Sequence, residues 1–335
     1  MRIIIPMAGR GTRLRPHTLT VPKPLLPIAG KPIVHRLVED IVKVVDTPVE
    51  EIAFIIGSDF GDKVEAQLRQ IAEQVGAQAS IVYQEEKLGT AHAILCAQAS
   101  LEGRVIVAFA DTLFKADFTL DGDADGVIWV QEVENPAAYG VVKYDAQHVI
   151  TDFVEKPAEF VSNLAIIGIY YFKDGAYLRR ELQYLIDNDL KDRGEYQITN
   201  ALENMKNKGT RFRTGQVEEW LDCGNKDVTI QTHQRYLEFI KDQPLISPTA
   251  QTENTVLIPP VYLGKEVKVR NAVVGPYVSI GDGCVIEDSV IKNSIIQENT
   301  EIKNAIFANS MVGNHVRFEG SVKDLSIGDY NQWRD

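Results

Sequence analysis

The sequence predicts an α/β protein in which a doubly wound, mostly parallel sheet is followed by a short parallel β-helix. Two observations support this prediction. Short β-branched segments alternate with amphipathic helical segments up to about residue 240, and small aliphatic residues recur every five or six positions from about residue 256 to residue 322. The segment between them, 241–254, is polar and broken by prolines, and is expected to be a linker. A chain of 335 residues is long enough for both domains.

Residues 1–240 are expected to form one domain of alternating strands and helices. The clearest expected strands are Arg2–Ile5, Ile52–Ile56, Ser80–Tyr83 and Val105–Phe109. The expected helices are Ile33–Val45, Asp62–Val75, Ala91–Ala99, Ala176–Ile186, Ile198–Met205 and Val228–Ile240. This alternation favours a mostly parallel, Rossmann-like sheet, and such sheets bind ligands at the carboxyl ends of their strands. The glycine-rich turn Ala8–Pro16 and Asp111 each follow a strand, so we expect them to converge.

Residues 255–325 are expected to form the β-helix, and residues 326–335 a tail. The aliphatic and aromatic repeat consists of Leu263, Val269, Val274, Ile280, Ile286, Ile291, Ile296, Ile302, Val312 and Phe318. Several of these residues precede a glycine, as Ile280 precedes Gly281. Inward aliphatic side chains with small residues at the corners are typical of a parallel β-helix. The irregular spacing indicates three or four coils, and the periodicity disfavours the alternative of a β-sandwich.

Positive charge is concentrated at the N-terminus of an acidic protein, whose net charge is −12. The segment 1–38 holds seven Lys or Arg and no Asp or Glu, so every acidic side chain of the protein lies beyond it. A local basic surface suits a small anionic ligand, whereas a nucleic acid usually needs a broad basic face. The turn Ala8–Pro16 contains glycines, which let backbone N–H groups approach phosphate oxygens. These features predict a nucleoside-triphosphate pocket and no nucleic-acid partner.

The composition predicts a globular protein of the cytoplasm. The chain is 44% apolar and 24% charged, and no run approaches the roughly 18 apolar residues that span a bilayer. Its N-terminus enters a strand at once, without the pattern of an export signal, so we expect no membrane partner. Cys96, Cys223 and Cys284 lie far apart, which argues against a disulfide framework or a zinc site and favours a reducing compartment.

Eight segments of the sequence are informative when taken together: GRGTRLRPHTLTVPKPLLPIAGKPI at 9–33, YQEEKLGTAHAI at 83–94, AD at 110–111, AYGVV at 138–142, VEKP at 154–157, SNLAIIGIYYF at 162–172, RGEYQITN at 193–200 and WLDCG at 220–224. They resemble the signature motifs of the sugar-1-phosphate nucleotidyltransferases, the pyrophosphorylases that join a nucleoside triphosphate to a sugar 1-phosphate. Their number and order make the resemblance specific from the N-terminus to the end of the WLDCG segment. The resemblance also implies that the β-helix is left-handed, since several branches of the family carry one at the C-terminus.

The residues expected to act on the phosphates lie in the first of these segments. Arg13 is the candidate for stabilising charge on the departing pyrophosphate, with Arg10 and Arg15 as alternatives. Lys23 lies between two prolines in a rigid extended segment, which suits a point-charge contact to a phosphate. The expected nucleotide-binding residues are Ala8, Gly9, Gly11, Thr12, Arg13, Gln84, Gly89 and Thr90.

Two carboxylates are expected to bind Mg²⁺. Asp111 ends an apolar strand, and Asp222 lies in the WLDCG segment. Carboxylates and phosphate oxygens are the ligands that this hard cation prefers, and the resemblance implies that these two positions are the metal ligands. Many members of the family have Gly-Asp at the first position, where this chain has Ala110 and Asp111.

Gln84 is the residue expected to read the base. Its carboxamide offers an acceptor and a donor, which match the N3–H and C4 carbonyl of uracil or thymine. A carboxylate would suit guanine better, and the adjacent Glu85 keeps guanine open. Gly89 and Thr90 begin a helix, where Thr90 is also suited to be the N-cap. His92, in the same helix, is interpreted as structural.

The sugar phosphate is expected to meet a second group of residues. The resemblance implies that Gly140 contacts sugar hydroxyls through its main chain. Glu155 is suited to accept hydrogen bonds from two hydroxyls, and Lys156 to reach the phosphate. Ile166 is expected to line the pocket, and Arg193 is a second candidate phosphate ligand.

The sequence therefore predicts an Mg²⁺-dependent nucleotidyltransferase of the EC 2.7.7 type. The favoured substrates are dTTP or UTP and a glucose-type sugar 1-phosphate, with a mannose-1-phosphate guanylyltransferase as the alternative. Two other classes stay open: a non-catalytic regulatory relative, and a hexapeptide acyltransferase, for which the β-helix offers only His315 as a base. The β-helix is expected to serve as an oligomerisation surface or a lid, and the protein to be a homo-oligomer.

Overall fold

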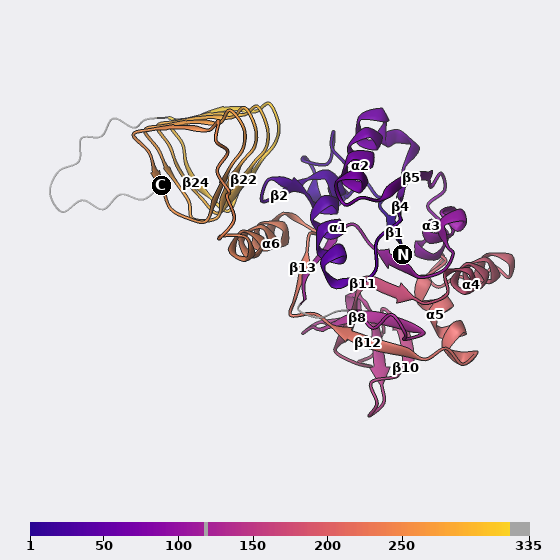
Figure 1. Cartoon of the computed structure of the whole chain (residues 1–335). Helices are drawn as coiled ribbons and strands as arrows, with labels where there is room; N and C mark the ends of the chain where they lie inside the picture. The colour runs from indigo at the N-terminus through magenta and orange to yellow at the C-terminus, as the bar shows by residue number, and fades with distance from the viewer. Residues whose placement is uncertain (117–119, 322–335) are drawn as a thin grey trace. The chain divides into compact units, whose positions relative to one another are not determined.

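A computed structural model describes residues 1–116 and 120–321 of the chain (Figure 1). The chain divides into two compact units. The N-terminal unit consists of Met1–Leu26 and Lys31–Val228, and the C-terminal unit consists of Pro27–Gly30 and the chain from Thr229 onward. In the described part of the chain, no helix combines the length and apolarity that crossing a bilayer requires.

A nine-stranded mixed sheet forms the centre of the N-terminal unit. Its strands are β1 (Arg2–Pro6), β4 (Glu51–Ile56), β5 (Gln78–Tyr83), β6 (Val105–Ala108), β8 (Gly126–Glu132), β9 (Gly140–Tyr144), β10 (Ile150–Glu155), β11 (Leu164–Phe172) and β12 (Phe212–Gln216). Their order is β10-β9-β11-β6-β1-β4-β5, with β8 paired to β11 and β12 paired to β8. Strands β6, β1, β4 and β5 are parallel, as predicted from the alternation of strands and helices.

The other half of the sheet is largely antiparallel, because its strands follow one another without long helical crossovers. Strand β11 runs antiparallel to β6, β8 and β9, and β9 and β10 form an antiparallel pair. Antiparallel strands need only a short connection, whereas parallel ones need a crossover of a dozen residues or more. The mixed α/β sheet confirms the predicted fold class of this part.

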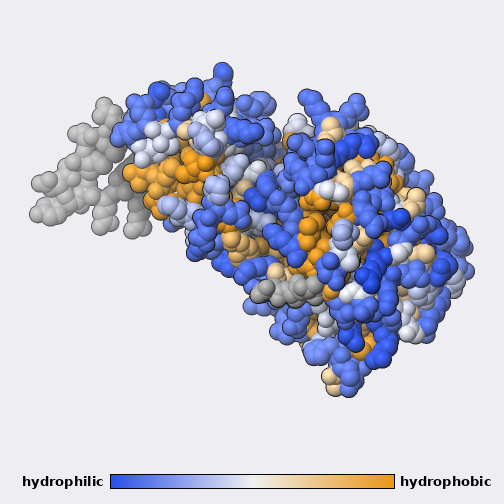
Figure 2. Space-filling view, in the orientation of Figure 1, coloured by the Kyte–Doolittle hydropathy of each residue, from blue (hydrophilic) through white to orange (hydrophobic). Residues whose placement is uncertain are grey.

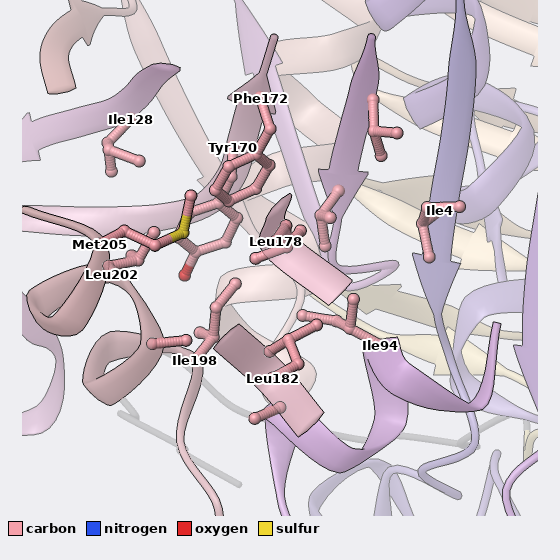
Figure 3. Close-up of a cluster of buried hydrophobic side chains, with 14 of the residues drawn as sticks. Ile4, Ile94, Ile128, Tyr170, Phe172, Leu178, Leu182, Ile198, Leu202 and Met205 are labelled. Carbon is pink, nitrogen blue, oxygen red and sulfur yellow. The ribbon is translucent and has the colours of Figure 1, made fainter. Parts of the chain in front are cut away.

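The predicted helices are all present, each with ends close to those expected. They are α1 (Ile33–Val44), α2 (Asp62–Gln74), α3 (Thr90–Cys96), α4 (Gly175–Asp187), α5 (Ile198–Asn207) and α6 (Lys226–Phe239). Figure 3 shows how side chains of α3, α4 and α5, among them Ile94, Leu182 and Leu202, gather with Ile4 and Tyr170 of the sheet in one buried core. This core fixes one face of the sheet and the starts of α3 and α5, where the candidate site lies.

Among the described residues up to 240, two short strand pairs lie outside the nine-stranded sheet. Strand β7 (Thr112–Lys115) pairs antiparallel with β13 (Glu219–Asp222). Strands β2 (Pro27–Ile28) and β3 (Lys31–Pro32) form a small hairpin. Its residues Pro27–Gly30 are part of the C-terminal unit, although they directly follow the segment that carries Lys23.

The C-terminal unit contains three parallel sheets of short stacked strands. The first sheet consists of β14 (Gln251–Glu253), β17 (Lys268–Arg270), β20 (Val285–Glu287), β23 (Glu301–Lys303) and β26 (Arg317–Glu319). The second consists of β15 (Val256–Leu257), β18 (Val273–Val274), β21 (Val290–Lys292) and β24 (Ile306–Ala308). The third consists of β16 (Val261–Leu263), β19 (Val278–Ile280), β22 (Ser294–Ile296) and β25 (Met311–Val312).

This arrangement confirms the predicted β-helix. In the first sheet Val269 pairs with Ile286, and Ile286 pairs with Ile302, so these three residues occupy the same place in successive coils. The repeat of five or six positions is therefore one side of a three-sided coil. Within the described residues two of these sheets have four strands and one has five, which makes four complete coils, in agreement with the three or four expected. Strand β14 lies within the predicted linker 241–254. Residues 322–325 of the expected β-helix and the tail 326–335 lie outside the described residues.

Asparagines at the corners of the β-helix adopt the left-handed conformation. Asn254, Asn271 and Asn304 all have positive φ, and the side-chain amide of Asn254 donates to Oδ1 of Asn271 at 2.9 Å. Asn271 in turn donates to Oδ1 of Asp288 at 3.1 Å. Asn and Asp tolerate this conformation better than other residues with a side chain. The corners of the β-helix therefore contain stacked asparagine and aspartate side chains in addition to the small residues predicted from the sequence.

Candidate active site

The turn after β1 is packed closely on the segment that carries Lys23. Gly11 has φ 70° and precedes a short 3₁₀ helix, η1 (Thr12–Leu14). The hydroxyl of Thr18 donates to the carbonyl of Gly11 at 2.8 Å. A Cβ atom at Gly11 would lie 2.5 Å from Cβ of Lys23, so a larger residue there would displace the lysine as well as strain the backbone.

Lys23 is buried and points at Asp111. The expectation that Lys23 lies in an extended segment is wrong: it begins the 3₁₀ helix η2 (Lys23–Leu25), and Pro22 and Pro24 fix the backbone on either side. Its Nζ atom lies 3.0 Å from Oδ2 of Asp111, although the two residues are 88 positions apart. The lysine side chain is 8% exposed and that of Asp111 is 45% exposed. The buried ammonium group of Lys23 thus pairs with a carboxylate that is more exposed to solvent.

The pairing of β7 with β13 brings the two candidate metal ligands together. Thr112 is opposite Asp222, and the N–H of Cys223 donates to the carbonyl of Asp111 at 3.1 Å. Burial raises the pKa of Asp222, and the negative charge of Asp111 raises this pKa further, whereas Lys23 and Arg13 lower it. The charge of Asp111 therefore acts on Asp222, and the two cations lie within electrostatic range of Asp222. This set of oxygen donors fits Mg²⁺.

A pocket of about 660 Å³ opens beside these groups. Ten residues predicted to serve the nucleotide, the phosphates or the metal line it: Ala8, Gly9, Gly11, Thr12, Arg13, Lys23, Gln84, Gly89, Thr90 and Asp111. Arg15, Lys87, Glu195 and Gly224 line it as well. The structure therefore brings the carboxyl end of β1 and the residues after β5 and β6 to one cavity, as expected for an α/β sheet.

Arg10 also lines the pocket, but a carboxylate neutralises it. Its Nε atom donates to Oδ2 of Asp59 at 2.6 Å, and the pair is exposed. Arg13 is exposed too, and its charge is felt by Asp222 and Tyr139. The charge of Arg13, unlike that of Arg10, contributes to the pKa of Asp222.

Gly89 and Thr90 join α3 to the chain just before α5. A Cβ atom at Gly89, whose φ is 118°, would lie 2.5 Å from the carbonyl oxygen of Tyr196. The hydroxyl of Thr90 accepts the N–H of Ile198 at 2.9 Å and donates to Oε1 of Gln197 at 3.1 Å. The suggestion that Thr90 caps its own helix is therefore wrong. Thr90 is the first residue of α3, and its hydroxyl satisfies a free N–H at the start of α5.

The residues predicted for the sugar phosphate form a second cluster. Gly140 and Glu155 face each other across the β9–β10 pair. A Cβ atom at Gly140 would lie 3.0 Å from Oε2 of Glu155 and 3.4 Å from Cδ1 of Ile166, so Gly140 lies beside both side chains. The Nζ atom of Lys156 lies 3.6 Å from Oε1 of Glu155. The backbone carbonyl of Lys156 accepts a hydrogen bond of 2.6 Å from the guanidinium group of Arg193.

Three further residues near these clusters were not predicted from the motifs. Thr199 donates to Oε2 of Glu155 at 3.0 Å and thereby fixes that carboxylate. The rings of Tyr139 and Trp220 meet edge to face at 5.1 Å. Burial raises the pKa of Tyr139, and the charge of Asp222 raises it further, which places this ring near that candidate metal ligand. Each of the three lies within one of the segments that resemble the family motifs, and this position was the only sign in the sequence that it is near the site.

Comparison with known proteins identifies the family. The nucleotidyl transferase family profile matches residues 2–238, and the chain belongs to this family. This confirms the resemblance seen in the motifs and the prediction of a nucleotidyltransferase enzyme.

Several relatives match along nearly the whole chain. One is a low-salt glycan biosynthesis nucleotidyltransferase, Agl11, of Haloferax volcanii, with 28% identity over 91% of this chain and 90% of the relative. Another is a glucose-1-phosphate thymidylyltransferase of Streptomyces griseus, with 25% identity over 99% of both chains. The catalytic subunit beta of mannose-1-phosphate guanylyltransferase of Drosophila melanogaster is 30% identical over 95% of this chain and 87% of the relative.

A solved structure is also similar. The crystal structure of a UDP-glucose pyrophosphorylase complexed with UDP-glucose superimposes with a TM-score of 0.58 and 26% sequence identity. The match covers 71% of this chain and 98% of the other.

Proposed function

We propose that the protein transfers a nucleotidyl group from dTTP or UTP to a glucose-type sugar 1-phosphate, with release of pyrophosphate. The observation that carries this proposal is the gathering of Arg13, Lys23, Asp111 and Gln84 around one pocket. A pocket with cations, a carboxylate and a nearly buried carboxamide suits a nucleoside triphosphate. Relatives whose names include thymidylyltransferase and UDP-glucose pyrophosphorylase support the choice of nucleotide and sugar.

The proposed reaction needs positioning and charge stabilisation and no general base. An oxygen of the sugar phosphate, already an anion, attacks the α-phosphorus. The bond from the α-phosphorus to the bridging oxygen of the β-phosphate breaks, and pyrophosphate leaves with that electron pair. We assign Lys23 and Arg13 to the phosphate charge that develops, while backbone N–H groups of the turn at Gly9, Gly11 and Thr12 orient the triphosphate.

We assign Asp111 and Asp222 to a Mg²⁺ ion. When bound, the ion would neutralise phosphate charge and help to align the reacting groups. The two carboxylates are adjacent across the β7–β13 pair, and burial disfavours a second negative charge there unless a cation is present. The ion pair between Lys23 and Asp111 supplies part of that compensation within the chain itself.

We assign the second cluster to the sugar 1-phosphate. The backbone of Gly140 and the carboxylate of Glu155 would bind hydroxyls, Ile166 would pack against the ring, and Lys156 and Arg193 would bind the phosphate. The 3.0 Å hydrogen bond from Thr199 fixes the Glu155 carboxylate in an orientation that suits this purpose. Guanylyl transfer to mannose 1-phosphate is the alternative, supported by the 30% identity with the Drosophila relative.

The rest of the molecule would support this chemistry. We propose that residues 1–240 form the catalytic domain and that the β-helix of residues 255–325 mediates assembly of a homo-oligomer, with 241–254 as the connection between them. A cytoplasmic location would supply both substrates.

The first experiment is a measurement of pyrophosphate release with Mg²⁺, in which dTTP, UTP, GTP, ATP and CTP are crossed with a panel of sugar 1-phosphates. Turnover with dTTP or UTP and a glucose-type sugar phosphate is the expected result. Turnover confined to GTP and mannose 1-phosphate would replace the proposal by its alternative. Folded protein without turnover for any pair would indicate a non-catalytic relative.

A further inference from the structure

The carboxamide of Gln84 is in contact with a histidine. Gln84 follows β5, its backbone N–H donates to the carbonyl of Ile56 at 2.9 Å, and the residue is 8% exposed. Its Nε2 atom lies 3.2 Å from Nδ1 of His92, the third residue of α3. Gln84 lines the pocket. The histidine thus touches the group proposed to read the base.

The start of α3 is held firmly, so His92 is a fixed neighbour. The N–H of Ala91, next to His92, donates to the carbonyl of Tyr196 at 2.9 Å. Gly89 is packed on the backbone of the same Tyr196, and the hydroxyl of Thr90 is bonded to Ile198. These contacts tie the first turn of the helix to a segment that is distant in the sequence. The ring of His92 therefore projects from a backbone with little freedom.

A carboxamide has an oxygen that accepts hydrogen bonds and an NH₂ group that donates them, and its hydrogen-bond partner determines which of the two faces the ligand. A neutral imidazole whose Nδ1 carries no proton accepts a hydrogen bond from the Nε2 group of Gln84. In that arrangement Oε1 and the second N–H of the amide remain available to a ligand. Exchanging the two ends of the amide by a half-turn would place Oε1 against a lone pair of Nδ1, which is repulsive.

The orientation of the amide matters because it distinguishes two classes of base. Uracil, thymine and guanine present a ring N–H next to a carbonyl. Cytosine and adenine present a ring nitrogen acceptor next to an amino group, the reverse pattern. An amide fixed with its oxygen toward the ring nitrogen of the base matches the first class and opposes the second.

We propose that His92 is a positioning residue that holds Gln84 in this orientation, so that the protein selects triphosphates of keto bases against those of amino bases. The inference rests on the proposed function, in which Gln84 reads the base, and goes beyond it by naming what orients Gln84. It assigns to His92 a role in specificity, where the sequence had indicated only a structural one.

The test compares UTP with CTP, which differ only along the edge in question. With the full chain, Mg²⁺ and the best sugar 1-phosphate, the ratio of kcat/KM for UTP to that for CTP is measured for the wild type and for four variants: His92→Phe, His92→Leu, His92→Asp and Gln84→Leu. Titration calorimetry of the same proteins with UTP and with CTP gives the corresponding ratio of dissociation constants, without turnover.

We expect the wild type to favour UTP, and His92→Phe and His92→Leu to lower the ratio at least about tenfold, the scale of one lost polar discrimination. His92→Asp should keep the ratio within about threefold, because a carboxylate can only accept and so preserves the orientation of the amide. Its added charge should weaken both triphosphates alike. A purely structural role for His92 would change both triphosphates equally and leave the ratio unchanged.

The Gln84→Leu variant separates the role of Gln84 from that of His92. If Gln84→Leu leaves the ratio unchanged, or if the wild type favours CTP, then Gln84 does not read the base as proposed, and the inference falls with that assignment. If Gln84→Leu abolishes the preference but both His92→Phe and His92→Leu keep the wild-type ratio, the proposed function stands and the role of His92 is wrong. The two apolar variants differ in size, so a folding defect in one leaves the other to decide.

Discussion

At the scale of single residues, the two carboxylates Asp111 and Asp222 make the sharpest prediction about the proposed chemistry. Replacing Asp111 by asparagine keeps its size and removes one negative charge beside Lys23, whose Nζ lies 3.0 Å from it. We expect Asp111→Asn to lower kcat/KM at least about a hundredfold, the loss typical of one strong electrostatic contact in an active site. We also expect a higher Mg²⁺ concentration for half-maximal activity, measured by a Mg²⁺ titration of pyrophosphate release.

A matched variant distinguishes metal binding from a general effect of charge. Asp123 is also an aspartate, its side chain is 92% exposed and it is paired with Arg104 at 3.8 Å. Asp123→Asn should leave turnover and the Mg²⁺ dependence unchanged. Near-normal turnover in a folded Asp111→Asn protein would show that the metal assignment is wrong.

The sequence predicted the site residues that belong to local patterns. Gly11 is an example, because a glycine-rich turn after an apolar strand commonly binds phosphate groups in α/β proteins. The contact between Gln84 and His92 and the hydrogen bond from Thr199 to Glu155 were not predicted. Such contacts depend on how α3 and α5 pack on the sheet, and no spacing along the chain encodes that packing.

At the scale of structural elements, the hairpin of β2 and β3 has a turn that demands glycine. Ala29 and Gly30 both have positive φ, at 49° and 83°, and the N–H of Ala29 donates to Nδ1 of His233 at 3.2 Å. A Cβ atom at Gly30 would lie 2.1 Å from the ring of Tyr262. We expect Gly30→Ala to lower the free energy of unfolding by about 2–4 kcal/mol, from backbone strain and overpacking together. Calorimetric unfolding measures this loss.

Gly76 provides the control for the strain alone. It follows α2, its φ is 76°, close to that of Gly30, and nothing lies within 4 Å of a Cβ atom built there. Gly76→Ala should therefore cost only about 1 kcal/mol. In addition, the double variant Gly30→Ala, Tyr262→Ala should cost less than the sum of the two single variants, because the added methyl group no longer meets the ring. Equal losses for Gly30→Ala and Gly76→Ala would contradict this explanation.

The elements themselves were predictable to different degrees. Helices such as α1 (Ile33–Val44) could be predicted from apolar residues three and four positions apart. The parallel strands β1 and β4 are short apolar runs between those helices. Strands β8 to β10 were not predicted, because an antiparallel region without helices between its strands lacks that alternation. The β-helix was predicted from its inward residues, whereas its asparagine corners gave no hydrophobic signal.

At the scale of the whole molecule, an exposed aliphatic ladder runs along the second sheet of the β-helix. Val256 pairs with Val273, Val273 with Val290, and Val290 with Ile306. Val256, Val290 and Ile306 are 57%, 42% and 85% exposed, while the alternate residues Val274 and Ile291 are fully buried. Figure 2 shows a hydrophobic area on this side of the C-terminal unit. A contiguous apolar strip on a protein surface usually marks an interaction site.

We propose that this ladder joins two copies of the chain. Each chain has a net charge of −12, so long-range repulsion opposes association and an apolar contact must overcome it. In a two-fold interface every substitution occurs twice. Ile306→Glu would thus bury two carboxylates without partners, and we expect the dissociation constant of the dimer to rise at least about a hundredfold. Light scattering coupled to size-exclusion chromatography, over a range of protein concentrations, measures it.

A control of equal charge separates the ladder from the overall repulsion. Gln251 is exposed on β14, in the first sheet, and Gln251→Glu adds the same single negative charge as Ile306→Glu. We expect this control to weaken association only slightly, and added salt to reverse its effect, because salt screens charges that remain in water. Salt should restore much less of the association of Ile306→Glu, since its loss comes from desolvating a carboxylate. A wild-type protein that is monomeric at every concentration, or an Ile306→Glu protein of unchanged mass, would rule the ladder out as the interface.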